Sequence, residues 1–235
     1  MKKFIFSLFD IFLISSQSIF AAGYLATYSM KVSNPAAYVE ALDELMSTDW
    51  GKSFAGDVSL HQYAFNGYDD ATHVVVLNYE NSESLGAGTE SFTDPVFLSF
   101  FAKTASMAEP VEQTLNMKLI SVYNENPEED QVYTIYRMQV KDAAGYAKEY
   151  TKLTKAQVDA GNIDGSYGLR QLVAGDTRYY THYAYTSAGS VAEAMASAET
   201  LYSSDSFAKF SDKVSDNRRV MNISILTNVT NYPAN

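Results

Sequence analysis

Residues 24–38 read YLATYSMKVSNPAAY, and residues 132–146 read VYTIYRMQVKDAAGY. Each stretch alternates apolar and polar residues and then passes through Asn34 or Asp142 into a helical pattern. The Tyr-x-Met-x-Val run of the first stretch recurs 108 positions later in the second. A repeat of this length is too long for a solenoid unit and has the size of a small domain. The sequence therefore predicts one module present twice.

The repeat continues beyond these stretches after a single inserted residue. Leu60-His61-Gln62 aligns with Leu169-Arg170-Gln171, and Thr72-His73 aligns with Thr181-His182. A polar segment with Pro127 and four acidic residues separates the copies. The predicted organisation is a leader over residues 1–22, a first module over 23–124, a linker over 125–131 and a second module over 132–235.

The first residues have the layout of a secretory signal peptide. Lys2 and Lys3 precede an apolar run, and Ala21, Ala22 and Gly23 end it. A membrane anchor is the alternative, but the run is short for a span and is interrupted by Asp10. We therefore expect cleavage near residues 21–23, no stable membrane insertion of the mature chain, and a periplasmic or extracellular location.

Composition excludes several classes of site and partner. The chain has 235 residues, of which 46% are hydrophobic, as is usual for globular proteins. It contains no cysteine, which excludes disulfides, thiolate nucleophiles and cysteine-based metal sites. The formal net charge of −11 makes nucleic acid a poor partner, because like charges repel.

Periodicity predicts the same order of elements in both copies: strand, helix, strand, strand, helix, strand. In the first module the predicted strands are 24–32, 58–65, 73–79 and 115–123. The predicted helices there begin at 35 and 95; the first ends before Trp50, the second ends near Glu109-Pro110, and 82–88 is less regular. In the second module strands are predicted over 132–140, 167–173, 179–186 and 220–227, and helices over 143–158, over 191–202 and from 205.

This order is that of the ferredoxin-like split βαβ, an α+β unit with four antiparallel strands and its helices on one face. Two such modules in tandem resemble the dimeric α/β-barrel superfamily, which includes the antibiotic-biosynthesis monooxygenase-like domains. The resemblance covers essentially the whole mature chain and rests on element order, module length and duplication. It implies that the two sheets pack face to face as a pseudo-dimeric α/β barrel. The superfamily includes cofactor-independent oxygenases, haem-handling enzymes and proteins of no known activity, so it transfers little function.

Histidines are the first candidates for chemistry. His73 and His182 occupy matching places at the start of the third strand of each module, and His61 matches Arg170. His61 or His73 could serve as a base or as a haem or metal ligand inside a barrel. The alternative is that they are strand residues with local hydrogen bonds, because no metal-ligand spacing surrounds them. We predict no metal site and assign no catalytic residue.

Strand alternation gives a second set of candidates. If Met30, Leu60 and Leu169 face the helices, then His61, Tyr63 and Arg170 face the barrel interior, as does Arg137. Such an interior could hold a small anionic or phenolic ligand. The alternative is that its cations pair with acidic residues where the two halves meet. The candidate ligand-binding residues are His61, Tyr63, His73, Arg137, Arg170 and His182.

The chain contains a single tryptophan, Trp50, which has no counterpart in the second module. It could gate a pocket or anchor a partner, but more often such a residue covers the end of the core. Aromatic stripes at helical spacing are interpreted as core. No P-loop, dinucleotide-binding glycine motif or nucleophile elbow occurs.

These observations favour a non-enzymatic extracytoplasmic barrel that binds a small ligand or a protein partner. The alternative is a cofactor-independent monooxygenase-like or haem-handling enzyme that uses a polar barrel cavity. The sequence does not identify a cofactor. Because the duplication supplies both halves of a barrel, a monomer is consistent with the sequence.

Overall fold

A computed structural model describes residues 23–67 and 69–234, and the predicted signal peptide lies outside these residues. The strands are β1 (Tyr24–Val32), β2 (Asp57–Phe65), β3 (His73–Tyr79), β4 (Ala108–Val122), β5 (Val132–Val140), β6 (Tyr167–Ala174), β7 (His182–Ala188) and β8 (Arg218–Tyr232). The helices are α1 (Pro35–Ser47), α2 (Asp49–Lys52), α3 (Ser82–Ser91), α4 (Pro95–Thr104), α5 (Ala143–Asp159), α6 (Val191–Ser203) and α7 (Asp205–Val214). A 3₁₀ turn, Pro127–Glu129, lies between the two copies.

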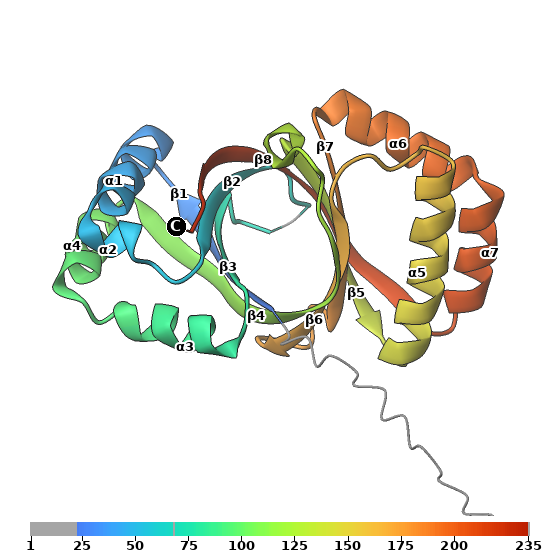
Figure 1. The fold of residues 1–235 in the computed structure, drawn as a ribbon, viewed down its shortest axis with the longest axis horizontal. Helices are drawn as coiled ribbons and strands as arrows, with labels where there is room; N and C mark the ends of the chain where they lie inside the picture. Colours follow the sequence, from blue (N-terminus) through green and yellow to red (C-terminus); the bar gives the residue numbers. More distant parts are fainter. Residues whose placement is uncertain (1–22, 68, 235) are drawn as a thin grey trace, which may run out of the picture.

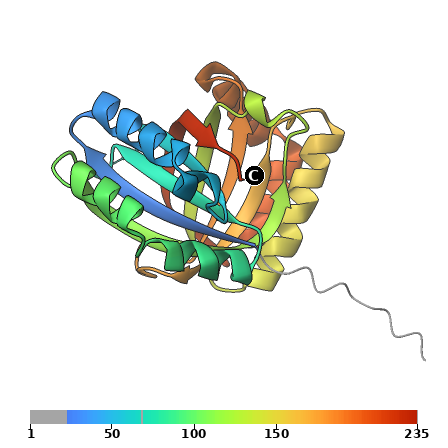
Figure 2. The same ribbon diagram turned by 60° about the vertical axis from the view of Figure 1, so that its left-hand side comes forward.

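The strands form one closed antiparallel barrel in the order β1-β3-β2-β8-β5-β7-β6-β4. Each copy supplies four strands, and the copies join where β2 pairs with β8 and β4 pairs with β6. In Figure 1 the barrel is seen end-on, with α1–α4 on one side and α5–α7 on the other. The turned view of Figure 2 shows the helices lying along the outside of the strands. The predicted α+β barrel is confirmed, and its sheets also join edge to edge.

Local sequence explains where the first helices begin. Asn34 accepts a hydrogen bond from the amide of Ala37 at 3.3 Å, and Pro35 occupies the first helical turn, where its missing N–H costs nothing. Asp142 caps α5 in the same way through Gly145 at 3.0 Å. The repeated stretch therefore builds the same strand–helix turn twice.

Three predictions about the first module are wrong. The segment predicted as less regular is the helix α3, which Asn81 begins with a capping box. The following helix α4 ends at Thr104, and β4 already begins at Ala108 rather than near residue 115. Pro110 is tolerated in β4 because the pairing with β1 is irregular between Ser29 and Met30.

The two largest hydrophobic cores lie outside the barrel, beneath the helices, and a smaller cluster of Tyr180, Tyr183 and Tyr185 lies inside it. Leu60 packs with Tyr38 and Leu42 of α1 in one core, and Leu169 packs with Tyr146 and Leu153 of α5 in the other. Both leucines are 0% exposed. This fixes the register predicted from strand alternation, so the polar residues of these strands point into the barrel. Within residues 23–67 and 69–234, no helix has both the length and the apolarity needed to span a membrane.

Candidate functional site

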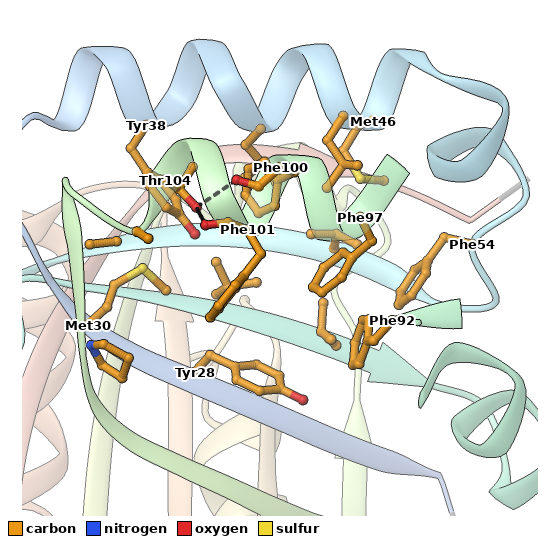
Figure 3. Close-up of a pocket in the computed structure, with 18 of the residues that line it drawn as sticks. Tyr28, Met30, Tyr38, Met46, Phe54, Phe92, Phe97, Phe100, Phe101 and Thr104 are labelled. Carbon is orange, nitrogen blue, oxygen red and sulfur yellow. Dashed lines mark hydrogen bonds between the residues drawn. The ribbon is translucent and has the colours of Figure 1, made fainter. Parts of the chain in front are cut away.

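A cavity of about 330 Å³ lies in the first module between its helices and the outer face of its strands. Figure 3 shows Tyr38 and Met46 of α1 above it, with Tyr28 and Met30 of β1 below. Phe97, Phe100 and Phe101 of α4 lie between these two levels. The cavity therefore lies between helix and sheet, and not in the barrel interior that strand alternation singled out. We call it the helix-side pocket.

Aromatic rings form most of the wall of the helix-side pocket. Phe97 stacks on Phe92 with 4.6 Å between ring centroids and lies 5.3 Å from the Trp50 ring. The indole of Trp50 is held by a hydrogen bond from Nε1 to the Ser91 carbonyl at 3.0 Å. Trp50 thus packs on the core, as the more common role implies, and also lines the helix-side pocket.

Polar residues are a minority of the pocket lining, namely Tyr28, Tyr38, Thr104, Ser29 and Gln113. Tyr28 and Tyr38 line it, and within the described residues neither hydroxyl has a hydrogen bond. Burial raises the pKa of both phenols, that of Tyr38 to about 12, so both are protonated donors at neutral pH. The Thr104 hydroxyl is already hydrogen-bonded to the Phe100 carbonyl at 3.0 Å. The pocket thus offers two free phenolic donors on an apolar surface.

The second module has a corresponding cavity of about 260 Å³. Arg218 lines it and lies over the rings of Phe210 and Tyr146, at 5.1 and 6.0 Å. Arg218 pairs with Val140 in β5 as Ala108 pairs with Val32 in β1, so the two positions are equivalent. The cation makes this pocket less suited than the helix-side pocket to an apolar ligand.

Two of the predicted ligand-binding residues meet inside the barrel. His61 and Arg170 line a cavity of about 170 Å³, together with three tyrosines of β5 and β7. The two residues are 7% and 1% exposed, respectively. The pKa of His61 is lowered to about 4 by burial, so its ring is neutral at pH 7.

Two other predicted residues also face the interior but do not line this cavity. The Tyr63 hydroxyl is 3.2 Å from Oγ of Ser29. Nη2 of Arg137 lies 2.8 Å from Oε2 of Glu112, an ion-pair contact in which the N–H is not directed at the oxygen. For Arg137 the alternative reading from sequence therefore holds, because this cation pairs with an acid of the other half.

The remaining two, His73 and His182, do not join the interior set. His73 has the strand parity of Val75 and Leu77, which pack beneath the helices, and His182 has that of Ala184. Their Nδ1 atoms contact the hydroxyls of Thr72 and Thr181 at 2.9 and 3.0 Å. The matching histidines thus hold equivalent local contacts, and grouping them with the barrel residues was wrong.

Sequence reasoning missed the helix-side pocket because it assigned its aromatic stripes to core. One available signal was the difference between the copies. Trp50 and the Phe97–Phe100–Phe101 cluster are concentrated in the first module, whereas the second has smaller and more polar residues in its corresponding helices. Among the described residues no group of three or more histidine or acidic side chains is placed to hold a metal ion.

No protein-family model matches the chain, and no curated protein matches it significantly. Solved structures do resemble it. A provisionally assigned monooxygenase from Fusobacterium nucleatum subsp. nucleatum is 14% identical with a TM-score of 0.62, and the match covers 92% of this chain and 96% of that one. An anthrone oxidase-like protein is 10% identical with a TM-score of 0.59, covering 91% and 93%. A haem-binding protein from Thermus thermophilus is 10% identical with a TM-score of 0.52, covering 89% and 92%.

These likenesses extend over nearly the whole chain at low identity, so they establish the fold. The closed barrel, the duplicated strand order and the external helices agree with them. The chain therefore has the fold of the dimeric α/β-barrel superfamily, with both halves of the barrel in one polypeptide.

Proposed function

We propose that the protein binds a flat, largely apolar small molecule in the helix-side pocket. The observation that carries this proposal is a cavity of about 330 Å³ walled by aromatic rings and lined by two tyrosines whose hydroxyls have no hydrogen bond within the described residues. Apolar pockets with a few polar groups are the usual form of small-molecule sites. The protonated phenols of Tyr28 and Tyr38 favour a ligand with hydrogen-bond acceptors, such as a polycyclic ketone or quinone.

The residues that line the helix-side pocket favour ligand binding without catalysis. The described lining of the helix-side pocket has no carboxylate and no imidazole that would accept a proton from a substrate. The fold likeness to monooxygenase-like proteins supports oxygenation of the ligand as the second candidate function. That candidate requires the bound molecule itself to react with oxygen, with the pocket supplying position and hydrogen bonds.

The lining does not fit haem. Within the described residues it offers no imidazole or thiolate to the iron, and no cation to the propionates. The raised pKa values of Tyr28 and Tyr38 disfavour the phenolate form that would bind iron. We therefore derive no haem chemistry for this pocket.

Trp50 supplies the test, because it is the only tryptophan and it lines the pocket. Titration with 1,8-dihydroxyanthraquinone should quench its fluorescence with saturation. The variant Ala108→Arg places the cation of the second module in the pocket and should weaken binding at least about tenfold, since burying an unpaired charge is costly. The matched control Arg218→Ala should leave the quenching unchanged.

Two results would contradict the proposal: quenching that never saturates, or equal affinity in wild type and Ala108→Arg. Oxygen uptake during the same titration separates the two candidate functions. Ligand-dependent uptake that Ala108→Arg abolishes would favour the oxygenase, and saturable binding without uptake would favour the binding protein.

We also propose that the protein acts outside the cytoplasm, on the signal-peptide pattern of residues 1–22. Expression of the full chain in a bacterial host should yield an exported protein. N-terminal sequencing of that protein should begin near residue 23. An uncleaved chain retained in the cytoplasm would contradict this proposal.

A further inference from the structure

We propose that the barrel interior holds a second site, which binds a monocarboxylate of about one aromatic ring in size, of the hydroxybenzoate class. The site is the cavity of about 170 Å³ that His61 and Arg170 line, at the end of the barrel where β1 and β5 begin. An apolar cavity of about 150 Å³ is known to accept benzene, so the available space suits one ring. This site is separate from the helix-side pocket and does not depend on the function proposed for it.

The charge of Arg170 is the first argument. Its Nη1 donates to the carbonyls of Ile120 and Leu169, and its Nη2 donates to the Tyr185 hydroxyl at 3.1 Å. Within the described residues no carboxylate lies within ion-pair distance of it. A guanidinium that is only 1% exposed and lacks a counter-charge is costly to bury, and an anionic ligand would supply that charge.

The other interior cation shows that the barrel can neutralise such a charge internally. Arg137 has Glu112 at 2.8 Å across the barrel. Two acids beside residues that line the cavity are engaged elsewhere. Asp130 accepts hydrogen bonds from two serine hydroxyls at 2.5 Å, and Asp57 accepts one from Asn78 at 2.7 Å. The missing partner of Arg170 is thus a specific feature of this end of the barrel.

Unsatisfied polar atoms are the second argument. Nε of Arg170, Nδ1 of His61 and Oδ1 of Asn78 are all buried without a hydrogen bond, and all three residues line this cavity. Buried polar atoms without partners are rare, and each costs free energy. A ligand carboxylate would accept hydrogen bonds from Nε–H of Arg170 and from Nδ1–H of His61. The other ring nitrogen of His61, Nε2, already contacts Oγ of Ser59 at 2.9 Å. A ligand hydroxyl would donate to Asn78.

The cavity walls indicate the size and nature of the rest of the ligand. Tyr133 meets the His61 ring edge-on at 5.1 Å, and Tyr185 lies beneath the Arg170 guanidinium at 4.9 Å. Such aromatic faces favour an aromatic ring over an inorganic anion. Tyr123 also lines the cavity yet is 57% exposed, which places it at the opening to solvent.

Isothermal titration calorimetry at pH 7.5 of the chain from residue 23 to residue 235 tests the site with sodium 4-hydroxybenzoate. We expect one molecule to bind per chain and phenol, which lacks the carboxylate, to bind at least about tenfold more weakly. Arg170→Met should weaken 4-hydroxybenzoate binding at least about tenfold. The double variant Arg137→Met/Glu112→Met removes the paired interior charges and should bind as wild type does.

A second measurement covers the case in which Arg170→Met does not fold. In the wild-type protein the ring proton signals of the three histidines can be followed by NMR during the titration. Only His61 should shift, because His73 and His182 lie on the helix side of their strands. Lack of calorimetric binding, equal binding by Arg170→Met, or a titration that leaves the His61 signal in place would each overturn the proposal.

The outcome is independent of the helix-side pocket. Arg170→Met should retain the quenching of Trp50 by 1,8-dihydroxyanthraquinone, and Ala108→Arg should retain 4-hydroxybenzoate binding. If Ala108→Arg abolished both, the two ligands would share the helix-side pocket and the barrel would hold no site of its own.

Discussion

The neutral ring of His61 makes the stability of the protein depend on pH. Burial lowers its pKa from 6.5 to about 4 in the folded chain, while the unfolded chain keeps the ordinary value. The unfolded state therefore takes up a proton below about pH 6.5 that the folded state refuses until about pH 4. The resulting stability is present above pH 6.5 and is lost as the pH falls through this window.

We expect the free energy of unfolding to fall by about 2 kcal/mol through His61 between pH 7 and pH 5. Urea denaturation of wild type and His61→Gln at both pH values measures this, and the variant should lack that part of the loss. Burial also lowers the pKa of His73 and His182, so a smaller residual loss should remain in the variant. A normal NMR titration of His61 near pH 6.5 would contradict the expectation.

The ion pair of Arg137 and Glu112 gives a second prediction at single residues. Their side chains are 15% and 17% exposed. Glu112→Gln leaves the guanidinium without its counter-charge and should lower the free energy of unfolding by about 3 kcal/mol. Adding Arg137→Met should recover most of that loss, because the double variant buries no charge. A double-mutant cycle with no coupling between the two positions would show that the pair contributes nothing.

Strand alternation predicted which of these residues face the interior, because a side chain changes face at each residue. It did not predict which interior cation is paired. Glu112 lies in β4 and Arg137 in β5, strands that are not neighbours in the barrel. Their contact depends on barrel closure and on the irregular β1–β4 pairing, and neither is encoded in the local pattern. His73 was a candidate because histidine is a common catalytic and ligand-binding residue. Its position in the strand alternation, however, places it on the helix side of β3.

Helix α3 shows how two glycines in one element can have opposite roles. A Cβ at Gly88 would lie 2.5 Å from the ring of Tyr79, whereas a Cβ at Gly86 would meet nothing within 4 Å. Tyr79 is 1% exposed, so its ring has little room to move. Gly88 therefore allows α3 to approach β3 closely.

We predict that Gly86→Ala stabilises the protein by up to about 1 kcal/mol, because alanine has the higher helix propensity. Gly88→Ala should instead destabilise it by about 1–3 kcal/mol through overpacking against Tyr79. Thermal unfolding of both variants provides the comparison, with each serving as control for the other. Stabilisation by both would mean that the helix can shift away from Tyr79 without cost.

These glycines also explain why α3 was not predicted. Gly86 and Gly88 lower helix propensity, and little of the segment is apolar, so the pattern lacks a helical stripe. The capping box at Asn81 was the available signal. The strands were predicted more closely, and β1, β3 and β5 have the predicted bounds. β8 extends to Tyr232 because β2 pairs with its polar end, a contact between copies that local alternation does not reveal.

At the scale of the whole molecule, β4 and β8 connect the two copies. Each pairs first with a strand of its own module, β4 with β1 and β8 with β5. Each then continues alongside a strand of the other module, β4 beside β6 and β8 beside β2. Because these strands belong to both halves, the barrel has no free edge, and neither half can close its sheet alone. The helix-side cores are separate, but they lie on one shared sheet. We therefore expect the chain to unfold as a single cooperative unit.

A pair of matched core variants tests this cooperativity. Leu60 and Leu169 occupy equivalent places in the two cores, and each is 0% exposed. Replacing either with alanine should lower the free energy of unfolding by about 3–5 kcal/mol. Trp50 reports only on the first module, whereas far-UV circular dichroism reports on both. In a cooperative barrel Leu169→Ala should shift the Trp50 transition as far as Leu60→Ala does, and both probes should coincide. A Trp50 transition that Leu169→Ala leaves in place would show that the modules unfold independently despite the strands they share.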